Sequence, residues 1–181
     1  MFPLKNVLIT GKPGVGKSTL VSRLIERAKE LGMKVGGLST PEIRIGGRRI
    51  GFKLVDIATG EEGILAKVGI RGPVVSKYGV NLEDLRRVGV GAIKRAIIES
   101  DLIVIDEIGK MELFSKEFKQ AVIDALDSEK PVIATVGKFL RYPFVKEILN
   151  REDILLFEIT KGNRDTVFKE ILDILFKKDV V

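Results

Sequence analysis

Two residue types are missing from this sequence of 181 residues, which contains no cysteine and no histidine. The absence of cysteine excludes disulfide bonds, zinc–thiolate sites and thiol nucleophiles. The absence of histidine removes the commonest general base and metal ligand. Gln120 is the only glutamine, and this composition, with 31% charged residues, is typical of proteins from hot environments. Any chemistry must therefore come from carboxylates, lysine, arginine, hydroxyl groups and backbone amides.

Long apolar runs are missing as well. No stretch approaches the roughly 18 apolar residues that span a bilayer, and the apolar run within residues 1–10 is too short for a signal peptide. These absences predict a cytoplasmic protein with no membrane contact. The net charge of +6 and the pI near 9.5 suit polyphosphate ligands or nucleic acid. A nucleic-acid partner stays open, because a modest excess of lysine and arginine is also typical of a solvated surface. The sequence leaves the oligomeric state unknown.

The length and the lack of a linker or repeat predict one domain spanning residues 1–181. Apolar β-branched runs alternate with segments of helical period, which predicts an α/β fold: a mostly parallel sheet with helices on both faces, a three-layer sandwich. The predicted strands are 7–10, 35–40, 102–105, 132–136 and 154–159. The predicted helices are one that follows the first strand and its glycine-rich loop, then 82–98, 115–126, 143–149 and 164–177. Gly46-Gly47 predicts an added antiparallel hairpin of 42–45 and 48–55, whereas 59–81 gives only short strands and loops.

A phosphate-binding motif follows the first predicted strand and precedes a helix. It reads Gly11-Lys12-Pro13-Gly14-Val15-Gly16-Lys17-Ser18 and matches the P-loop pattern G-x-x-x-x-G-K-S/T. Its glycines let backbone N–H groups surround the β-phosphate at a helix N-terminus. Lys17 is expected to reach the β- and γ-phosphates, Ser18 to coordinate Mg²⁺, and Thr19 to complete the nucleotide-binding segment. The alternative is a chance glycine-rich turn between a strand and a helix.

Two carboxylates, Asp106 and Glu107, end the apolar run 102–105. In P-loop proteins an acidic residue at the tip of a neighbouring buried strand orders the hydration shell of Mg²⁺, and we assign this role to Asp106, which makes it a nucleotide-binding and metal residue. Glu107 can take a proton from a water molecule in line with the γ-phosphorus, and without histidine it is the best base available. The alternative is a pair of solvated carboxylates that end a strand.

Asp106-Glu107-Ile108-Gly109 also fits the D-x-x-G pattern of switch GTPases. A GTPase should carry Asn-Lys-x-Asp after a later strand, whereas this chain offers Thr160-Lys161-Gly162-Asn163-Arg164-Asp165 after the last one. Strict guanine selection is therefore not expected. Asn163 can hydrogen-bond the base and Arg164 can stack on it, although Asn163 is equally well explained as a helix N-cap.

Other candidates stand on single residues. Thr135, on the strand after Asp106, could sense the γ-phosphate through its hydroxyl, or be an ordinary strand threonine. Four basic residues could close over developing phosphoryl charge, although each is also typical of a solvated surface. They are Arg48, Arg49, Arg71 and Lys77.

Several motifs together resemble a known family, the small thermostable P-loop nucleoside triphosphatases that include the cancer-related nucleoside triphosphatase of vertebrates. The resemblance covers nearly the whole chain, and its marks besides the P-loop are Gly46-Gly47-Arg48-Arg49-Ile50-Gly51-Phe52, Asp106-Glu107-Ile108-Gly109-Lys110-Met111-Glu112-Leu113-Phe114-Ser115, and Asn163-Arg164. It implies a RecA-like P-loop fold and slow, Mg²⁺-dependent hydrolysis of ATP, GTP, CTP, UTP and TTP to the diphosphate. It also makes Lys110 and Glu112 candidates for residues around Glu107, with Lys110 counted as catalytic beside Lys17 and Glu107.

The sequence departs from the family pattern at one place. The family usually has Arg-Val-Gly before Lys77-Tyr78, and this chain has Val74-Val75-Ser76. A phosphate contact of that arginine would have to come from Arg71 or Lys77.

Two other functions remain open. A small-molecule kinase of the same fold would use the glycine-rich middle segment to hold an acceptor. A nucleotide-switched module that binds nucleic acid or protein would use the basic charge. The sequence identifies neither the physiological substrate nor a phosphoryl acceptor.

Overall fold

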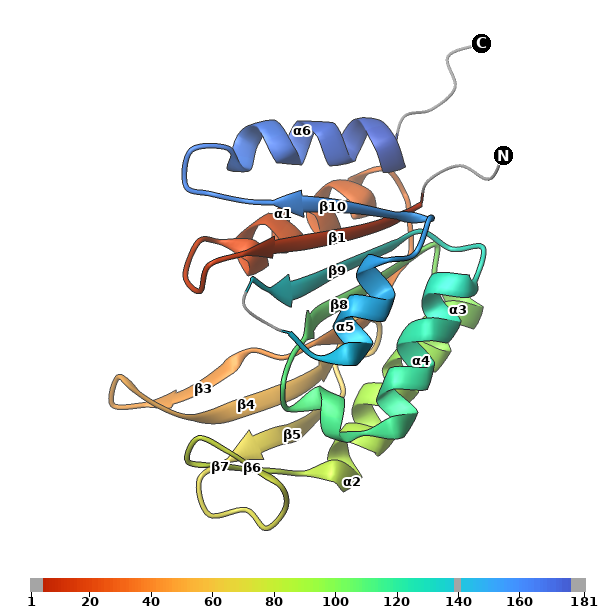
Figure 1. Cartoon of the computed structure of the whole chain (residues 1–181). Helices are drawn as coiled ribbons and strands as arrows, with labels where there is room; N and C mark the ends of the chain where they lie inside the picture. Colours follow the sequence, from red (N-terminus) through yellow and green to blue (C-terminus); the bar gives the residue numbers. More distant parts are fainter. Residues whose placement is uncertain (1–4, 139–140, 177–181) are drawn as a thin grey trace.

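The computed structural model describes residues 5–138 and 141–176. Its centre is one 10-stranded sheet in the order β10-β1-β9-β8-β2-β4-β5-β7-β6, with β3 paired to β4 (Figure 1). The strands are β1 (Asn6–Gly11), β2 (Val35–Ser39), β3 (Glu42–Ile45), β4 (Arg48–Asp56), β5 (Glu62–Lys67), β6 (Val74–Val75), β7 (Tyr78–Val80), β8 (Leu102–Ile108), β9 (Val132–Gly137) and β10 (Ile154–Glu158).

The half of the sheet from β10 to β2 is parallel. Its strands are nearly continuous apolar runs, and β1, β8 and β9 are almost wholly buried, as expected of strands covered on both faces. β9 lies between β1, which leads into the glycine-rich loop, and β8, which carries Asp106 and Glu107. This order confirms the prediction of a RecA-like, mostly parallel sheet.

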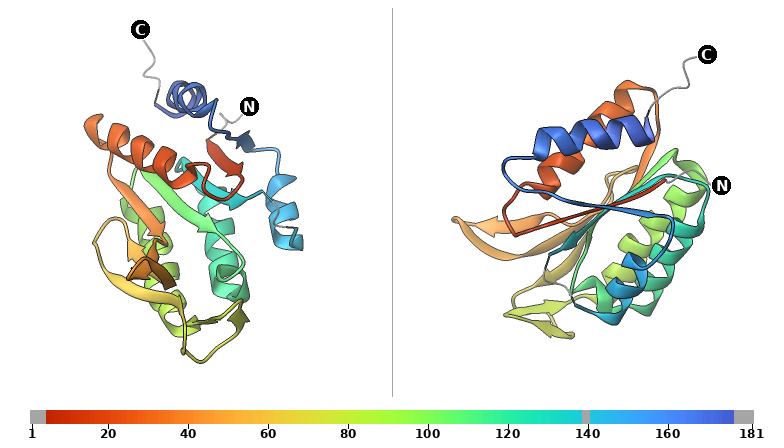
Figure 2. Two further views of the ribbon diagram at one scale, coloured as in Figure 1. Left: turned by 90° about the vertical axis from the view of Figure 1, so that its left-hand side faces the viewer. Right: turned by 45° about the horizontal axis from the view of Figure 1, so that its top comes forward.

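Helices cover both faces of the parallel half, which gives the predicted three layers (Figures 1 and 2). On one face, α1 and α6 pack on a core that includes Leu24 and Ile171. On the other, α3, α4 and α5 pack on a core that includes Ile93, Phe118 and Ile148. The α-helices are α1 (Lys17–Glu30), α2 (Leu82–Asp84), α3 (Gly91–Glu99), α4 (Lys116–Asp127), α5 (Pro143–Leu149) and α6 (Arg164–Leu175).

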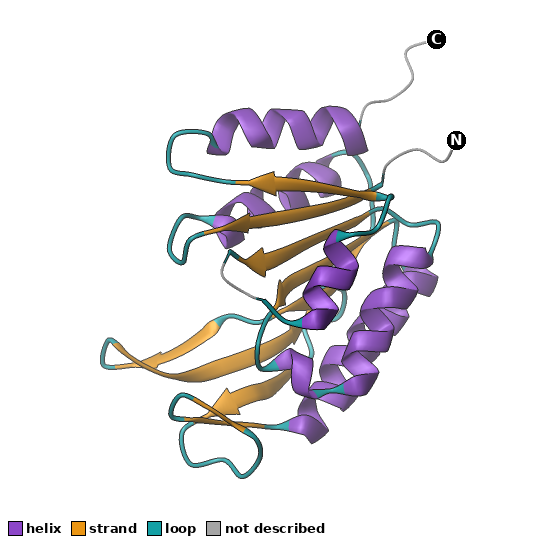
Figure 3. Ribbon diagram, viewed as in Figure 1, coloured by secondary structure: helices purple, strands orange, loops and turns teal. Residues whose placement is uncertain are grey.

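The rest of the sheet is antiparallel. Its β3–β4 hairpin projects away from the helices, whereas β5 lies against α2 (Figure 3). β3 and β4 form the predicted hairpin, and Gly46 and Gly47 at its turn have φ of 57° and 78°, values that favour glycine. The segment 59–81, predicted only as short strands and loops, supplies β5, β6 and β7. The antiparallel part is therefore larger than the single hairpin expected.

Several predicted boundaries differ from those in the structure. The helix expected over 82–98 is split into α2, a π-helical segment η1 (Leu85–Val90) and α3. Within the π-helical segment, Gly89 packs closely against Leu38 and Leu54 of the sheet. The strand expected to stop at residue 105 runs on to Ile108, since Ile108 still pairs with Val136. The last helix ends at Leu175, and the predicted end at residue 177 lies outside the described residues.

No helix in the described part of the chain is both long and apolar enough to cross a membrane.

Candidate nucleotide-binding site

The P-loop lies at the carboxyl end of β1 and leads directly into α1, as the motif predicts. Its glycines are needed for the backbone path, since Gly14 and Gly16 have φ of 76° and 102°. Gly16 is also crowded: a Cβ atom there would lie 2.7 Å from Nη1 of Arg164. The loop therefore presents its N–H groups and the N-terminus of α1 to one place, an arrangement that binds phosphate.

Lys17 is folded back over this loop. Its Nζ donates hydrogen bonds to the carbonyl oxygens of Gly11 at 2.7 Å and Lys12 at 3.3 Å. The ammonium group is thus held above the loop, within the space that a phosphate would enter. Among the described residues it has no carboxylate partner within ion-pair distance.

A cavity of about 620 Å³ opens beside the P-loop. Three parts of the fold line it: the P-loop with the start of α1, the acidic end of β8, and the β3–β4 hairpin with the segment before it. The lining residues are Pro13, Gly14, Gly16, Lys17, Ser18, Thr19, Thr40, Glu42, Arg49, Phe52, Asp106, Glu107 and Gly137. The structure therefore brings Lys17, Ser18, Asp106 and Glu107 together, although they come from distant parts of the sequence.

Asp106 is oriented by two threonines. Its Oδ1 accepts a hydrogen bond from Oγ1 of Thr135 at 2.7 Å, and its carbonyl oxygen accepts from the backbone N and Oγ1 of Thr40 at 2.8 and 3.1 Å. Thr135 is wholly buried on β9 and is not among the residues that line the cavity. Its hydroxyl is thus engaged in orienting Asp106, whereas the sequence suggested that it could sense the γ-phosphate.

The donor atoms in the cavity fit a magnesium ion. Ser18 is an exposed hydroxyl at the start of α1, and Oδ2 of Asp106 has no hydrogen-bond partner among the described residues. Within 5–138 and 141–176, no cluster of three or more histidine, cysteine, aspartate or glutamate side chains could hold a metal. Mg²⁺ prefers hard oxygen donors and usually takes one or two from the protein, completing its octahedron with water and substrate phosphate. The chain thus offers the donor set of a metal bound together with nucleotide.

Glu107 is half-buried in the same cavity. Burial raises the pKa of its carboxyl, the neighbouring Asp106 raises it further, and Lys17 acts in the opposite direction. Its backbone N donates to Oγ1 of Thr40 at 3.3 Å, so Thr40 bridges both acidic residues. A carboxylate with these surroundings is a stronger base than a solvated one, because its charged form is less well solvated.

Glu112 lies behind Glu107 and is 2% exposed. Its Oε2 accepts a hydrogen bond from the N–H of Gly109 at 3.0 Å. A Cβ atom on Gly109 would lie 2.8 Å from Oε2 of Glu112 and 3.1 Å from Oε1 of Glu107, so both carboxyl groups approach this glycine. Burial, and then the charge of Glu107, raise the pKa of Glu112 to about 8. Glu112 is therefore protonated and neutral at pH 7.

Lys110 lies elsewhere. It is exposed and lines a different cavity, of about 190 Å³, together with aromatic residues that include Phe114 and Tyr142. It is not among the residues that line the cavity of Lys17 and Glu107. The shared sequence block thus places Glu112 beside Glu107 and leaves Lys110 on another surface.

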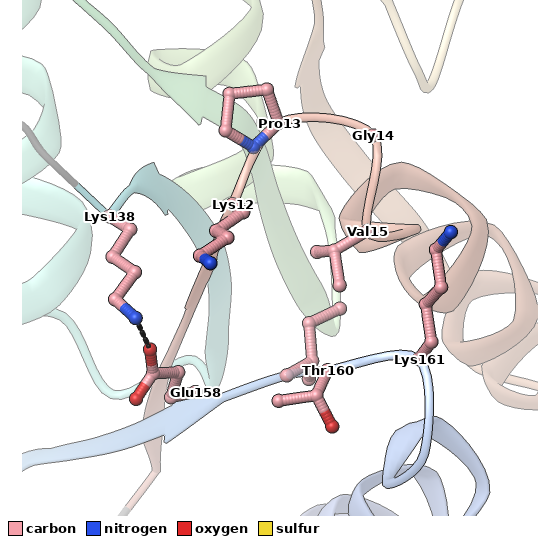
Figure 4. Close-up of a pocket in the computed structure, with 9 residues that line it drawn as sticks. Lys12, Pro13, Gly14, Val15, Lys138, Glu158, Thr160 and Lys161 are labelled. Carbon is pink, nitrogen blue, oxygen red and sulfur yellow. Dashed lines mark ion pairs between the residues drawn. The ribbon is translucent and has the colours of Figure 1, made fainter.

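A second cavity, of about 450 Å³, lies on the other side of the P-loop (Figure 4). Lys12 to Val15 form one wall, and Glu158 to Lys161, at the end of β10, form the other. Lys138 at the end of β9 makes an ion pair with Glu158 at 2.6 Å, drawn as the dashed line in Figure 4.

Asn163 and Arg164 lie behind this second cavity. Asn163 accepts a hydrogen bond from the N–H of Thr160 at 2.7 Å and donates one to the carbonyl oxygen of Glu158 at 3.0 Å. It occupies the N-cap position of α6, but its side chain makes no capping bond to the helix. Arg164 is half-buried against Gly16. Neither residue lines the second cavity: Asn163 fixes the loop that forms its wall, and Arg164 supports the P-loop.

The four basic candidates separate in the structure. Arg49 lines the cavity that contains Lys17, whereas Arg48, Arg71 and Lys77 do not. The sequence did not identify Thr40 and Glu42, which line this cavity, or Tyr78, which is buried beside Arg49, as site residues. The shared block Gly46–Phe52 was a signal for Arg49 and Phe52, but no local motif marks Thr40 or Glu42, which reach the cavity because β2 and β3 lie beside β8 and β4.

The fold and the paired acidic residues opposite a P-loop define a P-loop protein of the RecA-like class. Residues 6–172 match the NTPase family, and the chain belongs to this family. It is 52% identical to the nucleoside-triphosphatase THEP1 of Thermofilum pendens over 89% of this chain and 90% of that protein. It is 46% identical to the protein of the same name from Methanothermobacter thermautotrophicus, over 93% and 95% of the two chains.

Two solved structures support the same family assignment. The crystal structure of THEP1 from the hyperthermophile Aquifex aeolicus matches with a TM-score of 0.83 and 36% identity, over 95% of this chain and 99% of that one. The solution structure of a human cancer-related nucleoside triphosphatase matches with a TM-score of 0.79 and 38% identity, over 93% and 95%. The resemblance found in the sequence is thereby confirmed.

Proposed function

We propose that the chain hydrolyses nucleoside triphosphates to the diphosphate and phosphate, with Mg²⁺ as cofactor. The observation that carries this proposal is the position of Glu107, half-buried in the cavity that also holds Lys17, Ser18 and Asp106. The name shared by the relatives, nucleoside-triphosphatase, supports the same activity. Because all ten strands form one sheet, we also propose that residues 1–181 form a single domain.

Triphosphate binding uses the P-loop. Backbone N–H groups of the P-loop surround the β-phosphate, and Lys17 exchanges its two loop carbonyls for β- and γ-phosphate oxygens. Ser18 and Asp106 would hold the metal, and Thr135 keeps the carboxylate of Asp106 in place. Mg²⁺, when bound there, neutralises phosphate charge and fixes the γ-phosphate relative to the attacking water.

Hydrolysis then needs one proton transfer. A water oxygen bonds to the γ-phosphorus while its proton passes to the carboxylate of Glu107. The bond between the γ-phosphorus and the β–γ bridging oxygen breaks, and the electron pair leaves with the diphosphate. The hydrogen bond from Glu107 N to Thr40 and the packing against Gly109 orient the base.

The second cavity suits the nucleoside. It adjoins the P-loop, and the walls formed by Val15, Ile159 and the methyl group of Thr160 supply apolar contact to any base. Both polar groups of the Asn163 side chain are occupied by backbone groups, which leaves no amide free to select one base. We therefore propose broad base specificity over ATP, GTP, CTP, UTP and TTP.

The test is phosphate release from these five nucleotides with Mg²⁺, for the parent, Glu107→Gln and the control Glu129→Gln. Glu107→Gln keeps shape but cannot take a proton, so hydrolysis should fall by about a hundredfold to ten-thousandfold with nearly unchanged nucleotide affinity. Glu129 is exposed and lines neither cavity, so its variant should match the parent. A preference above about a hundredfold for one base would contradict broad specificity.

Three results would contradict the proposal. If Glu107→Gln hydrolyses nucleotides at the parental rate, Glu107 is not the general base. Capture of the phosphoryl group by an added small-molecule acceptor would favour a kinase. Stimulation by RNA or DNA that disappears as salt rises would favour a nucleotide-switched binding module.

A further inference from the structure

The phosphate cavity contains a second cation besides Lys17. Among the residues that the structure describes, Lys17 and Arg49 are the two basic side chains that line it. Lys17 approaches from the P-loop, and Arg49 approaches from the β3–β4 hairpin. The two positive charges therefore face the cavity from opposite walls, with Asp106 and Glu107 between them in the sheet order.

The guanidinium group of Arg49 is held by several contacts. Its Nε donates to the phenol oxygen of Tyr78 at 3.1 Å, and its Nη1 donates to Oε1 of Glu42 at 3.2 Å. The Tyr78 hydroxyl in turn donates to the carbonyl oxygen of Arg49 at 3.2 Å. The Arg49 carbon Cζ lies 5.3 Å from the centre of the Phe52 ring and 5.8 Å from that of Tyr78. Such contacts fix an arginine that would otherwise be mobile on an exposed hairpin.

The supporting side chains are themselves fixed. Tyr78 is 2% exposed, and its ring meets that of Phe52 edge to face, with centroids 5.6 Å apart. Tyr78 and Phe52 come from different strands, β7 and β4. The antiparallel part of the sheet thus builds a buried aromatic support under one exposed cation.

Arg49 still has hydrogen-bond donors that a phosphate ligand can use. In the described part of the chain its Nη2 has no hydrogen-bond partner. Its one anionic partner, Glu42, lines the same cavity, so a phosphate entering there can replace that carboxylate as the acceptor. A guanidinium group binds phosphate oxygens through paired donors, which a lysine cannot do.

We propose that Arg49 is a catalytic residue that stabilises the γ-phosphoryl group in the transition state, and that Tyr78 is a positioning residue for it. This inference rests on the proposed hydrolysis. As the bond to the bridging oxygen breaks, negative charge on the γ-phosphoryl oxygens and on the bridging oxygen is redistributed, and Arg49 donates hydrogen bonds to the γ-oxygens. Arg49 keeps all its protons, and the proton of the water still passes to Glu107.

The adjacent Arg48 provides a matched control. It is exposed, carries the same charge on the same strand, and does not line the cavity. Arg49→Ala should lower kcat by about a hundredfold to a thousandfold and change KM by less than about threefold, as removal of a transition-state contact does. Arg48→Ala should keep the parental kcat and KM.

Binding measurements separate catalysis from folding. Arg49→Ala should bind Mg²⁺–ADP as the parent does but bind Mg²⁺–ADP with aluminium fluoride, which imitates the transferred group, at least about tenfold more weakly. Guanidinium ion added at low millimolar concentration should restore part of the lost kcat. Tyr78→Phe keeps the ring and loses the hydrogen bonds to Arg49, so it should lower kcat by about three- to tenfold without raising KM.

The outcomes are distinct. A parent that hydrolyses no nucleotide overturns both the proposed function and this inference. A parent that hydrolyses, with Glu107→Gln impaired and Arg49→Ala at the parental kcat, overturns the inference alone. Should Arg49→Ala fail to fold, Arg49→Lys decides: it keeps the charge and loses the paired donors, and a parental kcat in that variant also overturns the inference.

Discussion

Gly109 separates two carboxyl groups that have different surroundings. Glu107 faces the cavity, where Lys17 favours its charged form, whereas Glu112 is enclosed and meets the negative charge of Glu107. The N–H of Gly109 donates to Glu112. A neutral Glu112 adds no negative charge next to Glu107, whose own pKa is raised by burial and by Asp106.

The raised pKa of Glu112 predicts a pH dependence of stability. The folded protein retains a proton on Glu112 up to about pH 8, whereas the unfolded chain loses it near pH 4.5. Between these values the native state binds more protons, so the free energy of unfolding should fall as pH rises, by up to about 1.4 kcal/mol per pH unit. Glu112→Gln imitates the protonated form and should flatten this slope, as measured by urea unfolding from pH 5 to 9. The exposed control Glu129→Gln should keep it; equal slopes in the parent and Glu112→Gln would show that Glu112 does not carry this proton.

Sequence reasoning at the residue scale succeeded where neighbours in the chain are neighbours in space. The P-loop is one contiguous motif, and Asp106 and Glu107 end one apolar run. Thr40 and Glu42 reach the cavity through strand pairing, so no local pattern could identify them. The choice of Arg49 among four basic residues likewise depends on the aromatic support from β4 and β7.

At the scale of elements, periodicity identified the strands of the parallel half and the α-helices that cover it. Of those strands, β1, β8 and β9 are almost wholly buried and carry a strong apolar signal. The short strands β6 and β7 have two and three residues, too few for a period to be recognised. The apolar period predicted one continuous helix over 82–98 and gave no signal for the π-helical segment, in which Gly89 packs closely against Leu38 and Leu54.

Close strand packing predicts that Gly37→Ala is strongly destabilising. Gly37 on β2 has φ of 121°, and a Cβ atom there would lie 1.9 Å from the carbonyl oxygen of Val104 on β8. We expect a loss of about 3 kcal/mol or more in the free energy of unfolding, since backbone cannot move aside as a side chain can. The matched control is Gly60→Ala. Gly60 has φ of 77°, but a Cβ atom there would meet no heavy atom within 4 Å, so the substitution should cost only about 1–2 kcal/mol. If urea unfolding shows similar losses for both variants, the close contact between Gly37 and Val104 does not add to the cost of the substitution.

At the scale of the whole molecule, the nucleotide site joins the two halves of the sheet. The P-loop and Glu107 belong to the parallel half, whereas Glu42 and Arg49 belong to the antiparallel part. A bound nucleotide that contacts both parts therefore stabilises the folded chain as a unit.

This arrangement predicts a thermal shift. A non-hydrolysable triphosphate with Mg²⁺ at about 100 times its Kd should stabilise the protein by about 2.7 kcal/mol, seen as a rise in Tm. Lys17→Ala removes a charge-assisted hydrogen bond to phosphate and should bind about ten- to a hundredfold more weakly, with a correspondingly smaller rise. Lys116→Ala, an exposed lysine on α4, should behave as the parent. An undiminished shift in Lys17→Ala would contradict the role of the P-loop lysine.

The strand order also fixes when, during synthesis, the site can form. β1 comes first in the chain, yet its two neighbours are β9 and β10, the last two strands to be made. Until Val132 and the residues after it have left the ribosome, the apolar strand that carries the P-loop has no partner in the sheet. The loop closures that complete it span most of the chain, which makes them slow relative to local contacts. A nascent chain shorter than this therefore leaves β1 without a partner strand and the nucleotide site unassembled, even though its P-loop is already translated.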